Sequence, residues 1–166
     1  TLNGLHVDIA NINSKEQVVL SGMTADMDHA KTRIEKKLEG CENFRWVALN
    51  VSAPFHSRFM KAIHNDFRQV LSQSADKMNL DKASCVTSNY TGGYHCGDQN
   101  MIIDNLVEQL SNPVQWLENM RRLSEKADKV YEIGPNKPLR RFFKTIGKDV
   151  ISIVNLKDAE REFNKG

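Results

Sequence analysis

Residues 50–60 read NVSAPFHSRFM, and a single histidine, His56, lies in the middle of this short apolar stretch. The preceding residues, 44–52 (FRWVALNVS), predict a strand, and residues 57–73 predict a helix with one apolar stripe. His56 therefore lies at the junction between a predicted strand and a predicted helix, where active and binding sites of α/β proteins are commonly found. Imidazole is also well suited to proton transfer near neutral pH. The position favours a catalytic role, and a histidine satisfied in the core or at the surface is the alternative.

The residues before this stretch predict two strands and a helix. Strands are expected over 5–12 and 16–22, separated by Asn and Ser residues with turn chemistry. A helix is expected over 24–39, with Thr24 as its N-cap. Its apolar residues recur at helical spacing: Met27, Ala30, Ile34 and Leu38. The predicted order of elements in the N-terminal part is therefore strand, strand, helix, strand.

The residues after the histidine alternate short strands with helices. Strands are expected over 83–88, 129–134 and 150–154. Asp98 is expected to cap one helix, and Asn112-Pro113 is expected to end that helix and begin the next. A further helix is expected over 135–147. Strands separated by helices imply parallel pairing with crossover connections, so the fold class is α/β.

The composition is that of an ordinary globular chain. The 166 residues are 40% hydrophobic and 27% charged, and the net charge of +2 is too small to indicate nucleic-acid or membrane binding. Cys41, Cys85 and Cys96 are widely spaced and indicate neither a zinc site nor a disulfide framework, so we expect free thiols in the cytoplasm. No apolar run approaches the roughly 18 residues of a membrane span. The chain does not begin with Met, and we expect a fragment or a trimmed chain.

A histidine base needs a nucleophile, and the sequence does not supply one. The α/β signature is G-x-S-x-G, and no serine here has Gly two residues before it. Ser57 adjoins His56 but lacks this elbow. The other histidines have no HxH or HxxxH partner and are interpreted as surface residues: His6, His29, His64 and His95. The glycine-containing stretch 91–98 (TGGYHCGD) lacks the spacing of a phosphate loop and is interpreted as a plain loop.

A basic stretch follows the strand predicted over 129–134. Five basic residues and no acidic residue lie between Gly134 and Lys148: Lys137, Arg140, Arg141, Lys144 and Lys148. A solvated helix face is the ordinary interpretation. A docking surface for an acidic partner is the alternative.

Four stretches of the chain form a pattern: ANINSKEQVVLSG (10–22), VSAPFHSRFM (51–60), VEQLSNPVQW (107–116) and VYEIGPNKPLRRFFK (130–144). In this order they resemble the C-terminal half of malonyl-CoA:acyl-carrier-protein acyltransferases of the free-standing or trans-acyltransferase polyketide synthase type. The resemblance implies an incomplete ferredoxin-like small subdomain over 1–52. It implies the C-terminal part of an α/β-hydrolase-like large subdomain over 53–166.

The resemblance also implies roles for individual residues. His56 would be the general base of a Ser–His dyad, oriented by a backbone carbonyl at Gln109. Phe55 would limit the room beside the acyl group and favour malonyl. Asn11, Asn13 and Arg45 match positions near the CoA or pantetheine arm. Weaker carrier-protein docking contacts would come from Lys137, Arg140, Arg141 and Lys144.

The departures from the family pattern define the expected partners. The GHSxG serine, the glutamine-containing loop of the oxyanion hole and the arginine that clamps the malonyl carboxylate are all missing. Asn136 stands where the family usually has Gly, and Pro138 is also unusual. We therefore expect the N-terminal half of the same acyltransferase and an acyl carrier protein as partners. No permanently bound cofactor is expected; malonyl-CoA would be the substrate, and the carrier protein would bring phosphopantetheine. The alternatives are a catalytically inactive docking remnant or an acyl hydrolase of the same fold.

Overall fold

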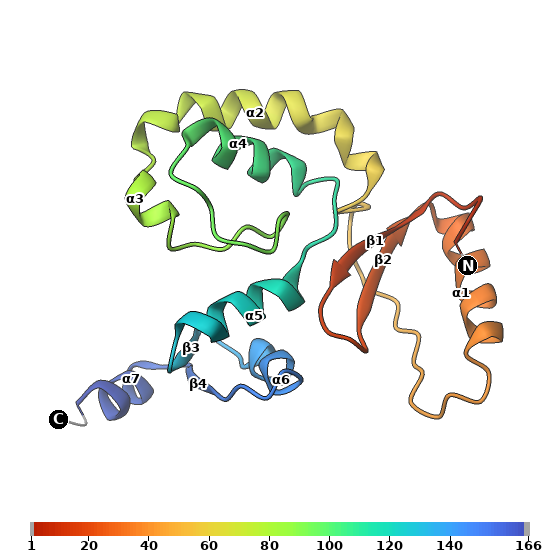
Figure 1. Cartoon of the computed structure of the whole chain (residues 1–166). Helices are drawn as coiled ribbons and strands as arrows, with labels where there is room; N and C mark the ends of the chain where they lie inside the picture. The colour runs from red at the N-terminus through yellow and green to blue at the C-terminus, as the bar shows by residue number, and fades with distance from the viewer. Residues whose placement is uncertain (1, 165–166) are drawn as a thin grey trace.

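The structure, a computed structural model, describes residues 2–164 (Figure 1). The strands are β1 (Val7–Ile12), β2 (Val18–Gly22), β3 (Val130–Ile133) and β4 (Val150–Ile153). The α-helices are α1 (Thr24–Lys37), α2 (His64–Gln73), α3 (Leu80–Ala83), α4 (Gln99–Glu108), α5 (Trp116–Lys126), α6 (Pro138–Lys144) and α7 (Leu156–Phe163). Two 3-10 helices, η1 (Arg58–Ile63) and η2 (Ala75–Lys77), precede and follow α2.

The N-terminal residues form a hairpin with one covering helix. β1 and β2 pair antiparallel, with a bulge between Ile9 and Asn11. The apolar side of the hairpin packs on α1, because Val7 and Ala30 are buried against each other together with Leu5. Leu20, Met27 and Trp46 complete this small core. The predicted strands and the predicted apolar face of the helix are confirmed here.

The C-terminal residues form a parallel pair of strands covered by helices. β3 pairs with β4 in parallel, as expected from the intervening helix α6. The core of this part is formed by Leu117, Met120, Phe143 and Val150. Trp116 meets Phe143 edge-on, with the ring centroids 6.1 Å apart. These contacts join α5 and α6 to the strands.

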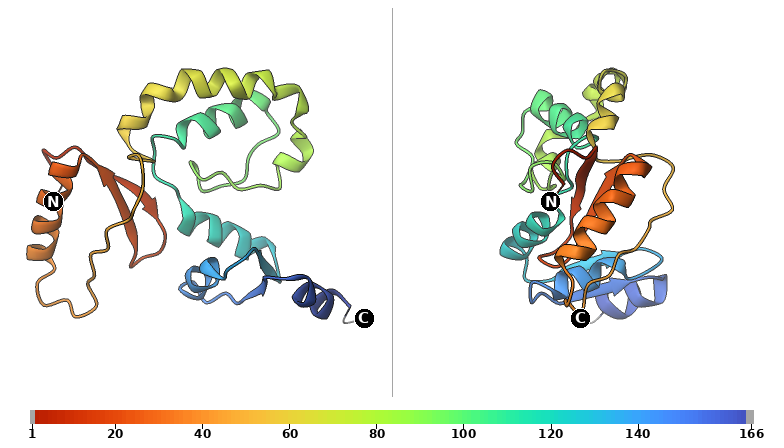
Figure 2. Two further views of the ribbon diagram at one scale, coloured as in Figure 1. Left: turned by 180° about the vertical axis from the view of Figure 1, so that it is seen from behind. Right: turned by 90° about the vertical axis from the view of Figure 1, so that its right-hand side faces the viewer.

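The middle of the chain links these two parts. α2 and α4 lie side by side, as both views in Figure 2 and the front view in Figure 1 show. The side chain of Asp98 accepts a hydrogen bond from the backbone N–H of Met101, so the predicted cap of α4 is confirmed. After α4 the chain passes along β1 and forms two backbone hydrogen bonds with it. The N–H of Ile12 donates to the carbonyl oxygen of Val114, and the N–H of Val114 donates to the carbonyl oxygen of Ala10. This contact fixes the segment after α4 against the hairpin.

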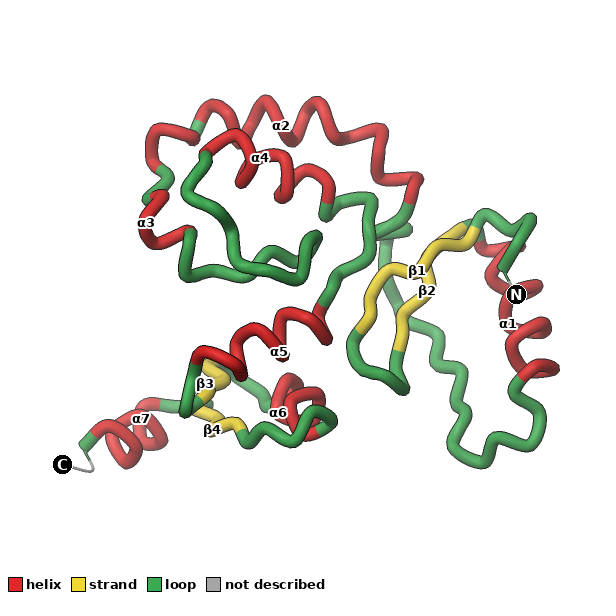
Figure 3. The backbone as a smooth tube through the Cα atoms, in the orientation of Figure 1, coloured by secondary structure: helices red, strands yellow, loops and turns green. Residues whose placement is uncertain are grey.

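Two predicted strands are not formed. Residues 44–52 are an extended segment without strand pairing, seen as part of the long green stretch between α1 and η1 in Figure 3. Every second residue of this segment is exposed at Val47, Leu49 and Val51, and Val47 has an exposed fraction of 71%. Residues 83–88 form only an isolated bridge between Thr87 and Tyr94. A strand needs a neighbour for its backbone hydrogen bonds. Within residues 2–164 no strand pairs with residues 44–52, and residues 83–88 exchange backbone hydrogen bonds with residues 93–95 only around this bridge.

Several helix boundaries also differ from expectation. α1 begins at Thr24 with Met23 as its N-cap residue, so Thr24 is not the cap. The helix predicted over 57–73 is split into η1 and α2. Pro113 does not begin a helix, because Val114 is held by its bridge to β1 and α5 starts only at Trp116. Helix α7 was not anticipated.

Candidate active site

The candidate site is built around the turn that carries His56. The turn comes between the extended segment and η1, and His56 has a backbone φ of 57°, the one positive φ outside glycine in residues 2–164. This left-handed conformation is unfavourable for a residue with a Cβ, and His is among the residues that adopt it more readily. The surrounding contacts must therefore hold the turn in place.

The backbone at the end of α4 supplies two of these contacts. The backbone N–H of His56 donates to the carbonyl oxygen of Leu110 at 3.1 Å. The ring nitrogen Nδ1 lies 2.7 Å from the carbonyl oxygen of Gln109. Because a carbonyl oxygen only accepts, Nδ1 must carry the proton, and in the neutral ring Nε2 is then the basic nitrogen. The described residues offer Nε2 no hydrogen-bond partner, so it is available to take a proton.

The neighbours of His56 differ in accessibility. Ser57 is fully buried, and its hydroxyl donates to the carbonyl oxygen of Pro54 at 2.5 Å. A buried hydroxyl with this partner is a structural group, so Ser57 does not serve as the nucleophile of His56. Phe55, by contrast, is 46% exposed beside the histidine. Its ring is free to contact a bound molecule.

Strand β1 runs close to the same site. Asn11 lies at the bulge of β1 and forms the bridge to Val114, a few residues beyond Gln109. Asn13 follows the strand, and its backbone N–H donates to Gln17 in the hairpin turn. Both asparagines are half-buried. The structure therefore brings the strand that carries Asn11, the end of α4 and the His56 turn side by side.

The remaining candidate residues lie elsewhere. Arg45 is exposed in the extended segment, and the described residues give it no ion pair or hydrogen bond. Arg140, Arg141 and Lys144 belong to α6, which Figures 1 and 2 show apart from the start of η1. Together with Lys148 they line a shallow hollow that also includes Thr145, Asp149 and Val150. Lys137, just before α6, is exposed.

One ion pair at the site was not expected from the sequence. The carboxylate of Asp8 in β1 accepts hydrogen bonds from the backbone N–H of Arg58, at 2.8 Å, and from its Nε, at 3.0 Å. The side-chain hydrogen bond from Arg58 is the main cause that lowers the pKa of Asp8 below its ordinary value of 3.8. The two residues are 50 positions apart, so no local pattern could reveal the pair.

Two other kinds of functional feature are absent from residues 2–164. No group of three or more His, Cys, Asp or Glu side chains that could hold a metal ion occurs within residues 2–164. None of the helices described here has the length and apolar character needed to cross a membrane. The three cysteines are free and exposed.

Comparison with known proteins shows what the chain is similar to. Over 158 residues, 93% of its length, the chain is 35% identical to a malonyl CoA-acyl carrier protein transacylase of Staphylococcus aureus. It superposes on the crystal structure of the malonyl CoA-acyl carrier protein transacylase from Clostridium perfringens with a TM-score of 0.75 and 29% identity, over 96% of this chain. The chain matches the C-terminal half of malonyl-CoA:acyl-carrier-protein transacylases. The resemblance seen in the sequence and the predicted fold class are thereby confirmed.

The chain corresponds to part of each matched protein. The chain spans about half the length of the transacylases it matches, 48% in both cases. It is also 32% identical over 130 residues to the polyketide biosynthesis protein ThaF of Burkholderia thailandensis, covering 77% of this chain and 10% of that protein. No family model matches the chain.

Proposed function

We propose that this chain supplies the general base of an enzyme that transfers malonyl from CoA to the phosphopantetheine thiol of an acyl carrier protein. The observation that carries the proposal is the pairing of His56 Nδ1 with the carbonyl oxygen of Gln109, which leaves Nε2 unpaired. The homology to malonyl-CoA:acyl-carrier-protein transacylases supports the choice of reaction.

In the proposed reaction His56 moves one proton in each half of the cycle. Nε2 takes the proton of a serine hydroxyl as that oxygen attacks the thioester carbonyl of malonyl-CoA. The carbon–sulfur bond breaks, and the imidazolium returns the proton to the departing CoA thiolate. In the second half Nε2 takes the proton of the phosphopantetheine thiol, which attacks the malonyl-serine ester, and the proton goes back to the serine. The Gln109 carbonyl stabilises the protonated ring and holds its orientation.

The serine is proposed to come from the N-terminal half of the same acyltransferase, outside these 166 residues. Three observations support this partner. No serine in the chain lies in a G-x-S-x-G elbow, and the matched transacylases are about twice as long. Apolar side chains also stand exposed on strand-like segments, with Val47 and Leu49 on the extended segment and Ile133, 77% exposed, at the end of β3. Such surfaces are typical of contacts with further protein.

The acyl and pantetheine contacts are proposed to come from residues near the histidine, and a contact with CoA from the extended segment. Phe55 would form one wall of the acyl pocket and restrict an α-methyl group, an effect worth about 1–3 kcal/mol. Asn11 and Asn13 would hydrogen-bond the pantetheine arm, and Arg45 would pair with a phosphate of CoA. No cofactor would be bound permanently.

The carrier protein is proposed to dock on the basic residues of α6. Arg140, Arg141 and Lys144 have no ion-pair partner among the described residues, so their charges are available to an acidic surface. Charge reversal here, for example Arg140→Glu with Arg141→Glu, should raise the KM for the carrier protein and leave the KM for malonyl-CoA unchanged. Equal effects on both substrates would contradict this docking site.

The central test is malonyl transfer by the complete acyltransferase that contains this chain. His56→Ala should reduce kcat by about 10²- to 10⁴-fold, the usual contribution of a general base. His29→Ala is the matched control, because His29 is an exposed histidine on α1. A His56→Ala variant with full activity would refute the assigned role. Retained carrier-protein binding by a wild-type protein that never transfers malonyl would favour the docking remnant instead.

The origin of the serine is tested by mass. The intact mass of the purified native material is measured before and after incubation with malonyl-CoA. A polypeptide bearing GHSxG, either a second chain or a longer form of this one, should gain one malonyl unit. Acylation of this 166-residue chain alone would contradict the proposed partner.

A further inference from the structure

Three sets of contacts hold the His56 turn in place. The end of α4 holds the backbone N–H and the ring of His56, through Leu110 and Gln109. Within the turn, the buried hydroxyl of Ser57 is bound to the carbonyl oxygen of Pro54. The third hold comes from β1, where Asp8 binds Arg58, two residues after the histidine. The first two sets of contacts act at or before Ser57. On the side of the turn that leads into η1, Asp8 binds Arg58, and the backbone N–H of Met60 donates to the carbonyl oxygen of Ser57.

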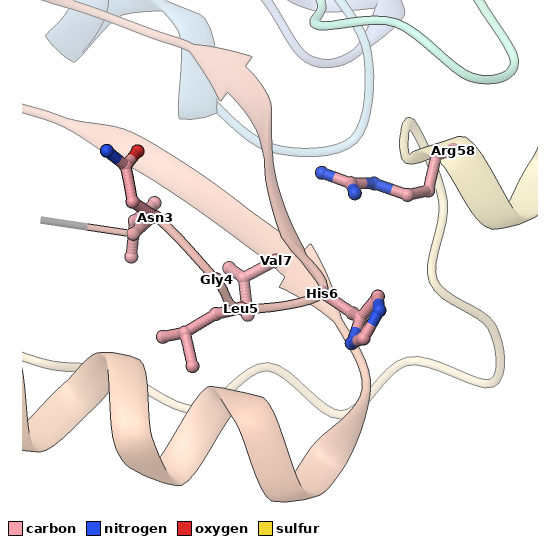
Figure 4. A pocket seen from close by; sticks show the side chains of 7 residues that line it. Asn3, Gly4, Leu5, His6, Val7 and Arg58 are labelled. Atoms are coloured by element: carbon pink, nitrogen blue, oxygen red, sulfur yellow. The ribbon is translucent and has the colours of Figure 1, made fainter.

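Asp8 binds both the main chain and the side chain of Arg58. Its Oδ2 accepts from the backbone N–H of Arg58 at 2.8 Å, and both carboxylate oxygens lie 3.0 Å from Nε. The guanidinium Nη2 also donates to Oδ1. Figure 4 shows the Arg58 side chain extending from its own segment toward the strands of the hairpin. The backbone contact restricts the turn itself, and the guanidinium contacts restrict where η1 can begin.

The environment of this pair makes it more than a solvated surface ion pair. The side chain of Asp8 is 22% exposed, whereas that of Arg58 is 51% exposed. A fork-shaped guanidinium on a carboxylate that also accepts a backbone N–H has a defined geometry that a single ion contact lacks. The positive φ of His56 is the kind of conformation that persists only when neighbouring contacts fix it.

We propose that Asp8 is a positioning residue for His56. Through Arg58 it fixes the turn so that Nδ1 stays on the Gln109 carbonyl oxygen and Nε2 remains the unprotonated nitrogen. The inference rests on the proposed function, in which Nε2 of His56 is the base. It assigns to the small hairpin, which carries no reacting group of its own, a role in orienting that base.

The test uses Asp8→Ala and Asp8→Asn in the complete acyltransferase. Asp8→Ala removes every contact to Arg58 and should lower kcat by about 10- to 100-fold, because small displacements of a reacting group cost this much. Asp8→Asn keeps an acceptor for the backbone N–H of Arg58 and should lose less. The KM for malonyl-CoA should change little in either variant, since Asp8 does not contact the substrate.

Asp26→Ala is the matched control. Asp26 is a carboxylate of the same N-terminal part that accepts from the backbone N–H of His6 and contacts its ring, and it has no contact with the His56 turn. If Asp26→Ala lowers kcat as much as Asp8→Ala, the effect is a general weakening of the hairpin and the proposal is overturned. Asp8→Asn keeps the proposal testable even if Asp8→Ala fails to fold.

Two readouts separate positioning from simple destabilisation. In a His56→Ala background, Asp8→Ala should cause no further loss of kcat, because its effect passes through the histidine. In nitrogen NMR spectra of the imidazole, the wild type should show the single tautomer protonated at Nδ1, and Asp8→Ala should show a mixture of tautomers. Additive kinetic losses, or an unchanged tautomer in Asp8→Ala, would overturn the inference. If the wild type transfers no malonyl, the proposed function fails and the NMR readout still decides the positioning role.

Discussion

The carbonyl oxygen of Gln109 accepts the ring Nδ1–H of His56 across 53 positions of sequence, at 2.7 Å. The acceptor belongs to the main chain, and the amide side chain of Gln109 takes no part in this hydrogen bond. The orientation of His56 therefore depends on where the backbone ends α4 and not on the glutamine side chain.

Gln109→Ala should consequently keep most of the malonyl transfer activity, in contrast with the loss of about 10²- to 10⁴-fold expected for His56→Ala. Alanine retains the carbonyl group and suits the end of a helix. Steady-state kinetics of the complete acyltransferase measure both variants. A loss in Gln109→Ala comparable to that of His56→Ala would mean that the side chain itself contacts the reacting groups.

Glu132 caps the helix that carries the basic residues. It is buried, and its carboxylate accepts from the backbone N–H groups of Leu139 and Arg140 and from the hydroxyl of Ser152. Glu132→Ala leaves these donors unpaired and should lower the free energy of unfolding by about 1–3 kcal/mol. Chemical denaturation measures the change. Glu125→Ala, at an exposed glutamate of α5, is the control and should be nearly neutral.

Gly92 lies against α5 in a left-handed conformation that favours glycine. Its φ is +71°, and a Cβ at this position would come within 2.6 Å of the Cβ of Glu118. Gly92→Ala should therefore lower the free energy of unfolding by more than the roughly 1–2 kcal/mol of a left-handed residue. Gly93→Ala is the matched control, since a Cβ there would meet its nearest atom only at 3.8 Å. Equal melting temperatures for the two variants would show that the loop moves away from α5 at no cost.

The burial of His95 should make the stability of the folded protein depend on pH. Burial lowers its pKa below the ordinary value of 6.5, because the charged ring would lose solvation. As the pH falls below 6.5, His95 binds a proton in the unfolded chain but remains neutral in the folded chain. The free energy of unfolding therefore decreases as the pH falls from 6.5 to the lower pKa of the folded state. His95→Gln should flatten the unfolding free energy between neutral pH and that lower range. His29→Gln, at an exposed histidine of α1, is the control for the substitution itself.

The elements that were anticipated from the sequence are those with local causes. The apolar spacing of α1, the cap at Asp98, and the strand–helix–strand order from β3 to β4 depend on neighbouring residues and were predicted correctly. The strands expected over 44–52 and 83–88 were wrong, because a strand also requires a distant partner. The start of α5 was misplaced because the bridge between Val114 and Asn11 overrides the local preference of Pro113.

The same distinction between local and distant causes applies to the candidate site. By itself the sequence determined the similarity to malonyl-CoA:acyl-carrier-protein transacylases, the position of His56 and the absence of a serine elbow, because these are recorded in short runs of residue types. Only the tertiary structure decided which nitrogen of His56 is free and which carboxylate holds its turn. Every residue has a carbonyl oxygen, so nothing distinguishes that of Gln109 in the sequence, and Asp8 meets Arg58 only after the hairpin has packed beside η1.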